Sequence, residues 1–269
     1  VAIQAQLAAL ETGKHTNPCL PMKTNDVDTP FDTITYTFDP NYIHSLSDWY
    51  NVQLCENHNG DVWNNFFSSA VDESSTPFTF IVNNLVIDSY TFQGRRNQPF
   101  YIANVATFVC NNCVFRDLRI VYTHHDNPSD DRLYQQPTLM LAENIQLTGC
   151  VIDNVRYIPS ATVDEYSYDF SFARVDNFNT FAGTYHSYSL SVYNTTVTTL
   201  NSLSSFVHIL NSAESLDFDG LILESSFIDI AVTDALINYD QSMAITLSSS
   251  LDIRNTNFLD IRHGSILYA

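Results

Sequence analysis

A short polar segment at residues 123–132 holds the densest group of side chains that could do chemistry. Two imidazoles and three carboxylates fall within it: His124, His125, Asp126, Asp130 and Asp131. Groups of these types hold calcium or a transition metal, or transfer protons as general acids and bases. The order of the acids does not match the DxDxDG pattern of a calcium-binding loop. The segment therefore indicates either a weak metal site, with calcium as the candidate ion, or a solvated polar loop.

A second group consists of arginines that recur at one position of an internal repeat. Four of the nine arginines share this position: Arg96, Arg119, Arg156 and Arg262. Small polar residues lie two positions before three of them: Asp117, Asn154 and Asp260. A stripe of guanidinium groups could bind an acidic sugar, and one arginine could serve as the base of a polysaccharide lyase. The alternative is a ladder of Asp–Arg pairs that neutralises one turn of the fold, in which an exposed pair contributes at most about 1 kcal/mol. Neither interpretation identifies a catalytic residue.

The sequence also contains an acceptor for N-linked glycosylation. Asn194 is followed by Thr195 and Thr196, which matches the pattern N-x-[ST]. A match this short arises easily by chance. Combined with the acidic composition and the many Ser, Thr, Asn and Tyr residues, it favours a secreted or cell-surface location.

A repeat of short apolar strands must position these residues. One column of the repeat contains Phe92, Phe115, Ile152, Val197, Phe227 and Phe258, at intervals of 23, 37, 45, 30 and 31 residues. Apolar residues lie seven and five positions before most members, and a small polar residue lies two positions after. A fixed strand pattern with variable spacing is expected of stacked coils, because the strands must stay in register while the loops between them can grow. The small polar column is expected to mark a turn, where Asn or Asp can bond its own backbone.

The repeat predicts an all-β fold with two parts. Residues 79–269 are expected to form a parallel β-helix, a solenoid of stacked strands. Residues 1–78 are expected to contain an N-terminal helix and an irregular cap segment, because Ile3, Leu7 and Leu10 share one helical face before Gly13 and several prolines follow. A helix of this kind could cover the open end of the solenoid.

The register resembles that of the right-handed parallel β-helix in the pectin-lyase-like superfamily, which includes repeat proteins of microbial surfaces. The resemblance rests on six aligned repeats and covers residues 79–269. It implies a right-handed solenoid and also brings enzymes into view: polysaccharide lyases that use calcium and an Arg or Lys base, and polygalacturonases that use a set of aspartates. The polygalacturonase motifs are not reproduced, because Asn255-Thr256-Asn257 lacks the acid and His263-Gly264 lacks the leading glycine.

Charge and hydropathy exclude several partners. Asp and Glu outnumber Lys and Arg by 30 to 11, which gives a net charge of -19 and opposes binding to nucleic acid or anionic lipid. No apolar run approaches the roughly 18 residues of a membrane-spanning helix, so no transmembrane segment is predicted. The five cysteines include no paired CxxC motifs, so a zinc site is not predicted either.

These observations favour a non-catalytic structural protein over an enzyme. If residues 251–269 form a last coil, its backbone edge is open to pairing. We therefore expect either a longer natural chain or self-association end to end through this terminal rung, as in a filament or coat. The alternatives are a polysaccharide lyase or glycoside hydrolase acting on acidic polysaccharide, and a carbohydrate-binding adhesin. Glycans are candidate partners in each case.

Overall fold

The computed structural model describes parts of the chain, nearly all of them strands. The described residues are 33–37, 55–56, 62–63, 67–68, 78–89, 91–93, 100–101, 105–121, 138–158, 171–175, 185–210, 215–240, 245–262 and 264–268. Every one of them belongs to a strand or to a short turn between strands, so the predicted all-β class is confirmed for this part of the chain.

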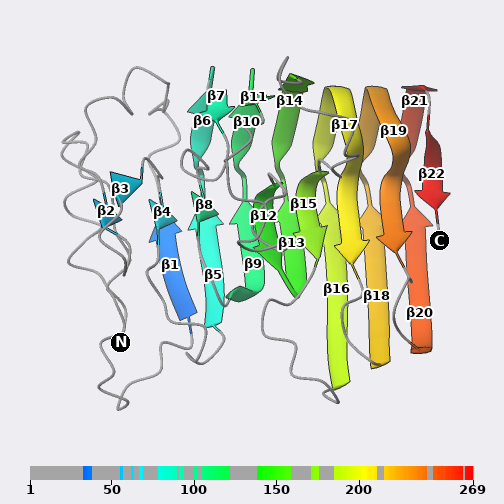
Figure 1. The fold of residues 1–269 in the computed structure, drawn as a ribbon. Coiled ribbons are helices and arrows are strands. Elements are labelled where there is room, and N and C mark those ends of the chain that lie inside the picture. Colours follow the sequence, from blue (N-terminus) through cyan, green and yellow to red (C-terminus); the bar gives the residue numbers. More distant parts are fainter. Residues whose placement is uncertain are drawn as a thin grey trace, which may run out of the picture.

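The first sheet contains seven parallel strands, one from each successive coil. In their order across the sheet they are β1 (Thr33–Thr37), β5 (Phe78–Asn83), β9 (Val105–Asn111), β13 (Asn144–Thr148), β16 (Tyr185–Tyr193), β18 (Ser215–Leu223) and β20 (Ile245–Arg254). Because the order across the sheet follows the order along the chain, each coil adds one strand to the same edge. Figure 1 shows these strands side by side along the molecule.

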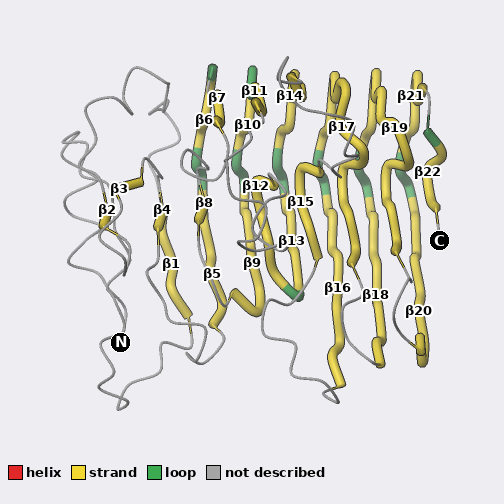
Figure 2. Tube along the Cα trace, in the orientation of Figure 1, coloured by secondary structure: helices red, strands yellow, loops and turns green. Residues whose placement is uncertain are grey.

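The second sheet contains eleven strands, which alternate along the chain with the strands of the first sheet. Its strands are β6 (Val86–Asp88), β7 (Thr91–Gln93), β10 (Val114–Arg116), β11 (Arg119–Val121), β12 (Thr138–Ala142), β14 (Val151–Ile158), β15 (Ser171–Val175), β17 (Thr196–Leu210), β19 (Ser226–Asp240), β21 (Asn257–Arg262) and β22 (Ser265–Tyr268). All their pairings are parallel, and short turns link the two sheets in each coil (Figure 2). This arrangement is that of a parallel β-solenoid.

Two small pairs of strands lie outside these sheets. β2 (Cys55–Glu56) pairs antiparallel with β3 (Val62–Trp63), and β4 (Phe67–Ser68) pairs parallel with β8 (Phe100–Tyr101). The helix predicted at residues 1–12 lies outside the described residues. Strand β1 falls within the segment predicted as a cap, and its parallel pairing with β5 shows that the first sheet begins before residue 79.

The predicted repeat column is confirmed in every member except the first. Successive strands pair these residues in register: Phe115, Ile152, Val197, Phe227 and Phe258. The residue that precedes Phe115 in this column is Ile87, whereas Phe92 pairs with Ile120. The sequence alignment was therefore wrong by five residues in the first coil. The predicted column of small polar residues begins accordingly at Ser89 and does not contain Gly94.

Two columns of turn residues bend each coil. The first lies between the sheets: Asn84, Asn112, Gly149, Asn194, Glu224 and Asn255, with φ between 46° and 64°. The second lies within the second sheet: Ser89, Asp117, Asn154, Thr199, Asp229 and Asp260, with φ between 53° and 59°. Asn and Asp tolerate this left-handed conformation better than most residues, because their short polar side chains bond locally. The predicted turn role of the second column is confirmed.

The turns keep the coils in register through their backbone. In the first column, the N–H groups from Asn84 to Glu224 each donate to a carbonyl of the next coil, for example Asn112 to Thr148 at 2.7 Å and Gly149 to Tyr193 at 2.9 Å. Gly149 also avoids a clash, because a Cβ atom there would lie 2.5 Å from Oδ1 of Asn112. The turns thus extend the hydrogen bonding of the sheets around the corner.

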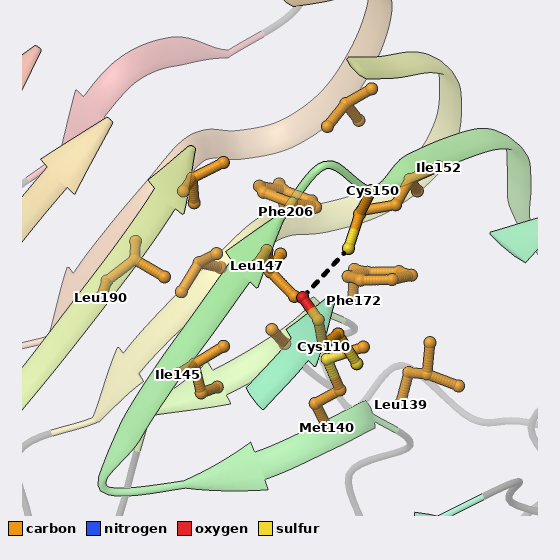
Figure 3. Packing of buried hydrophobic residues seen from close by; sticks show 14 of the residues in the cluster. Cys110, Leu139, Met140, Ile145, Leu147, Cys150, Ile152, Phe172, Leu190 and Phe206 are labelled. Atoms are coloured by element: carbon orange, nitrogen blue, oxygen red, sulfur yellow. Dashed lines mark hydrogen bonds between the residues drawn. The ribbon is translucent and has the colours of Figure 1, made fainter. Parts of the chain in front are cut away.

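Stacked apolar side chains fill the interior of the solenoid. Figure 3 shows side chains from both sheets pointing toward one another, among them Leu147, Phe172 and Phe206. Phe172 stacks on Phe206 with ring centroids 5.4 Å apart, and Phe206 meets the edge of Phe227 at 5.6 Å. All of these side chains are buried. The core therefore runs along the axis without interruption through the described coils.

Candidate functional site

The residues predicted to do chemistry are only partly placed by the structure. The acidic and imidazole segment at 123–132, with His124, His125, Asp126, Asp130 and Asp131, lies outside the described residues, and so does Arg96. The register places Thr91, and not Arg96, opposite Arg119. Within the described part of the chain, no three His, Cys, Asp or Glu side chains are arranged to hold a metal ion.

The remaining predicted arginines belong to a polar ladder on the outside of the second sheet. Arg119 and Arg156 pair in register and are exposed. Nε of Arg156 donates to Oδ1 of Asn154 at 2.6 Å, and the Asn154 amide donates in turn to Asp117. Arg262 forms an ion pair with Asp229 at 3.1 Å. Arg156 and Arg262 therefore bond to neighbouring turn residues.

Among the described ion pairs, the one with the least exposed acid involves residues that the sequence alignment missed. Asp88 and Arg116 pair in register in β6 and β10, and the guanidinium donates to Oδ2 of Asp88 at 2.6 and 3.0 Å. Burial opposes the charge on Asp88, but the hydrogen bonds and charge of Arg116, with a hydrogen bond from Ser89, outweigh it and lower the pKa of Asp88. In the next coil Asp153 accepts a hydrogen bond from Thr198 at 2.6 Å.

Asp88→Asn is expected to lower the free energy of unfolding at neutral pH by about 0.5–1 kcal/mol, because the pair is partly exposed. The folded-state pKa of Asp88 is lowered, so its contribution is complete above the pKa of the unfolded chain and disappears as the pH falls through the folded-state pKa. Urea unfolding at pH 7 and at about pH 2 checks this, with a difference between variant and wild type expected only at pH 7. Asp252→Asn, whose ion pair with Arg254 is more exposed, is the control and is expected to have a smaller effect. An equal effect of Asp88→Asn at both pH values would contradict the assignment.

A second ladder runs inside the turn and contains two cysteines. Its members follow the first turn column by one residue: Leu85, Cys113, Cys150, Thr195, Ser225 and Thr256. From Cys113 onward, each thiol or hydroxyl contacts two carbonyl oxygens, one two residues earlier and one in the preceding coil. Sγ of Cys150, for example, lies 3.6 Å from the oxygen of Thr148 and 3.3 Å from that of Cys110 (Figure 3). Thr195 repeats this with Tyr193 and Leu147.

The environment of these thiols keeps them protonated. A hydrogen bond with Cys113, together with burial, raises the pKa of Cys150, and a hydrogen bond with Cys110 together with burial raises that of Cys113. Burial raises the pKa of Cys110 as well. Because thiolates are the reactive form of cysteine, these buried thiols are poor nucleophiles and act as hydrogen-bond donors. The ladder is therefore structural.

Cys150→Ser is expected to keep the stability within about 1 kcal/mol of wild type, because a hydroxyl replaces a thiol donor as it does at Ser225. Cys150→Ala removes the donor and leaves a small cavity, so a loss of about 1–3 kcal/mol is expected. Urea unfolding of both variants checks the difference. Equal stability of the two would show that the donor contributes nothing.

The structure also locates the glycosylation acceptor. Asn194 is exposed at a tight turn, and Thr196 beside it is exposed as well. Thr195 between them is buried, because its side chain belongs to the hydroxyl ladder. The acceptor asparagine and the threonine that a glycosylating enzyme reads are thus both on the surface.

The terminal coil, formed by β20, β21 and β22, exposes side chains that are buried in every comparable position. Ile222 in β18 and Ile237 in β19 are 0% exposed, whereas their register partners Ile253 and Leu267 are 36% and 45% exposed. Among the described strands, β20 pairs only with β18, and β21 and β22 pair only with β19. This surface, which we call the end face, offers both apolar side chains and an open backbone edge.

Comparison with known proteins adds no relative: no family model, no curated protein and no solved structure matches this chain. The described residues contain no helix long and apolar enough to cross a membrane. The described residues therefore define the class as an all-β solenoid of parallel strands.

Proposed function

We propose that this chain is a non-catalytic structural subunit, secreted or displayed at a cell surface, that associates end to end through the end face. In this proposal the solenoid is a right-handed parallel β-helix of the pectin-lyase-like type. The observation that carries the proposal is the rise in exposure from 0% at Ile222 to 36% at Ile253, one coil further along the same column. An apolar interior and an open strand edge at one surface favour addition of another coil.

The outer ladders support a structural role over an enzymatic one. A polysaccharide lyase or glycoside hydrolase needs acids and a base gathered around one bond of the substrate. In the described residues, acids are instead held by neighbouring side chains: Asp88 by Arg116, Asp229 by Arg262 and Asp252 by Arg254. These pairs are spread from β6 to the terminal coil, as expected if they stabilise the turns of successive coils and do not form one catalytic site. Incubation with acidic polysaccharides with calcium present should therefore release no product.

Sedimentation velocity tests the proposed association. Each copy carries a charge of -19, so repulsion between copies should weaken association at low salt and screening should strengthen it. We expect larger species to increase with protein concentration. They should also be more abundant in about 0.5 M NaCl, where the Debye length is shorter, than in about 0.05 M NaCl. A single monomeric species at every concentration and both salt levels would overturn the proposal.

A glycan on Asn194 belongs to the same proposal, because a secreted chain would meet the glycosylating enzymes with this turn exposed. Protein from the native source should lose mass on enzymatic removal of N-linked glycans, and Asn194→Gln should abolish this loss. Asn194 lies in the left-handed turn column, so the control is Asn112→Gln, which changes the same turn position two coils earlier without touching the acceptor. A mass unaffected by deglycosylation would contradict this part of the proposal.

A further inference from the structure

Among the described strands, the first sheet has an unpaired edge at each of its two ends. Strand β1 is the first of its seven strands and pairs only with β5 among the described residues, and β20 is the last and pairs only with β18. The two strands lie at opposite ends of the sheet in Figure 1. Since all the strands are parallel, β1 of one copy can lie beside β20 of another without any change of direction.

We infer that the end face binds β1 of a second copy of this chain, so that the first sheet continues from one copy to the next. This inference rests on the proposed end-to-end association and specifies the partner surface. The contact joins two different surfaces, so it is heterologous, and repetition of it extends an open filament instead of closing a dimer.

The register of the sheet fixes which residues meet. One outward column runs through all seven strands: Thr33, Thr79, Thr107, Asn144, Ser189, Asp219 and Ser250. Two residues further along each strand, a parallel column joins Thr35 to Asp252, and two residues beyond that another joins Thr37 to Arg254. Continuation of the same register across the contact therefore places Ser250 beside Thr33 of the second copy, and Arg254 beside Thr37.

The side chains at these positions are chemically compatible. Thr33, Thr35 and Thr37 are exposed on β1, and each carries a hydroxyl that can both donate and accept hydrogen bonds. The facing positions on β20 carry a hydroxyl, a carboxylate and a guanidinium, all of which bond to hydroxyls. Hydroxyl ladders of this kind already join coils within the sheet: Ser250 donates to Asp219 at 2.6 Å, and Asn83 donates to Thr37 at 3.1 Å. No like charges face each other across these three positions.

The two alternate positions of each strand are also brought side by side by this register. The register brings Ile34 opposite Leu251 and Tyr36 opposite Ile253. Leu251 and Ile253 are the more exposed ends of two columns, whose earlier members Leu190 and Ile222 are buried. A second copy would thus add a further strand beside Leu251 and Ile253, as each coil does within one chain.

Disulfide trapping between separately made full-length variants tests the inference. Thr33→Cys is mixed with Ser250→Cys under mild oxidation by oxidised glutathione, and the cross-linked peptide is identified by mass spectrometry. The matched control mixes Thr37→Cys with Ser250→Cys, because residue 37 lies four residues along the same strand, about 13 Å away. We expect at least roughly tenfold more cross-link in the first mixture, since Cα atoms more than about 7 Å apart cannot be bridged.

The outcomes separate this inference from the proposed function. Cross-linking of Ser250→Cys alone, at the level of the mixture, would indicate a symmetric contact between two end faces and would overturn the inference. Equal yields with Thr33→Cys and Thr37→Cys would overturn the register. If sedimentation shows large species but neither mixture cross-links, the second copy binds elsewhere and only this inference fails. If the protein sediments only as a monomer, the proposed function fails with it.

Discussion

Replacing Phe206 with alanine is expected to lower the free energy of unfolding by about 3–5 kcal/mol, the usual range for loss of a buried aromatic ring. Phe206 is almost fully buried and lies between two rings, stacked on Phe172 at 5.4 Å and against the edge of Phe227 at 5.6 Å. Phe227 in turn stacks on Phe258 at 5.3 Å. Removal of the middle ring therefore leaves a cavity between coils as well as the loss of its own contacts.

Urea unfolding followed by circular dichroism measures this loss. Phe206→Leu should cost less, because leucine keeps part of the volume, and Gln146→Ala on the exposed face of β13 should stay within about 0.5 kcal/mol of wild type. If Phe206→Ala were no more destabilising than Gln146→Ala, the continuous aromatic core would not hold the coils together, and the stacking described above would be wrong.

Ile253→Lys is expected to weaken self-association by more than about 100-fold while leaving the fold intact. The lysine would be solvated in the monomer, because residue 253 is 36% exposed at the end face. In the assembled state its charge would be buried among apolar side chains without a partner, which costs several kcal/mol, and about 2.7 kcal/mol already corresponds to 100-fold. Sedimentation velocity gives the change in association, and circular dichroism confirms that the variant is folded.

The control for this variant is Val151→Lys. Val151 is an apolar residue of similar exposure, 39%, but it lies on the outer face of β14, within the row of coils. The Val151→Lys variant should leave association unchanged, apart from the small effect of one added charge. Leu267→Lys, at an exposed residue of the terminal coil whose register partner Ile237 is buried, provides a second variant of the end face. Association that survives both end-face variants would show that the end face is not the interface.

The spacing of apolar residues was sufficient to predict a solenoid and the register of five of its coils. It failed in the first coil, where Phe80 and Val82 fit the pattern as well as Leu85 and Ile87 do. An alternating pattern specifies which residues share a face, but not which of two neighbouring runs belongs to which sheet. The turn residue Asn84 separates the two runs, and it is the signal that could have decided between them.

That error also hid the most clearly defined ion pair. With Phe92 in the column, Asp88 has no place opposite Arg116, and Arg96 is placed with the other arginines instead. The cysteine ladder was missed for a different reason. The alignment of Cys113 with Cys150 was visible in the sequence. The continuation of the same column as Thr195 and Ser225 is recognised only when each side chain is seen to contact carbonyl oxygens in the same way.

The long segments of the second sheet could not be predicted from the repeat. β17 and β19 each run for 15 residues and pair across bulges after the left-handed turn, where the repeat pattern has already ended. The exposure of the end face is likewise a property of neighbours in space. Residues 222 and 253 are both isoleucine. They differ in exposure because a neighbouring coil covers Ile222, whereas no described coil covers Ile253.

Electron microscopy of the purified native protein tests the central claim most directly. The account predicts unbranched filaments whose axial repeat is the height of one subunit, at least about 34 Å for the seven stacked strands of the first sheet at about 4.8 Å each. Dispersed single particles at concentrations and salt levels that favour association would contradict end-to-end stacking, and with it the proposal that this solenoid is the subunit of a larger structure.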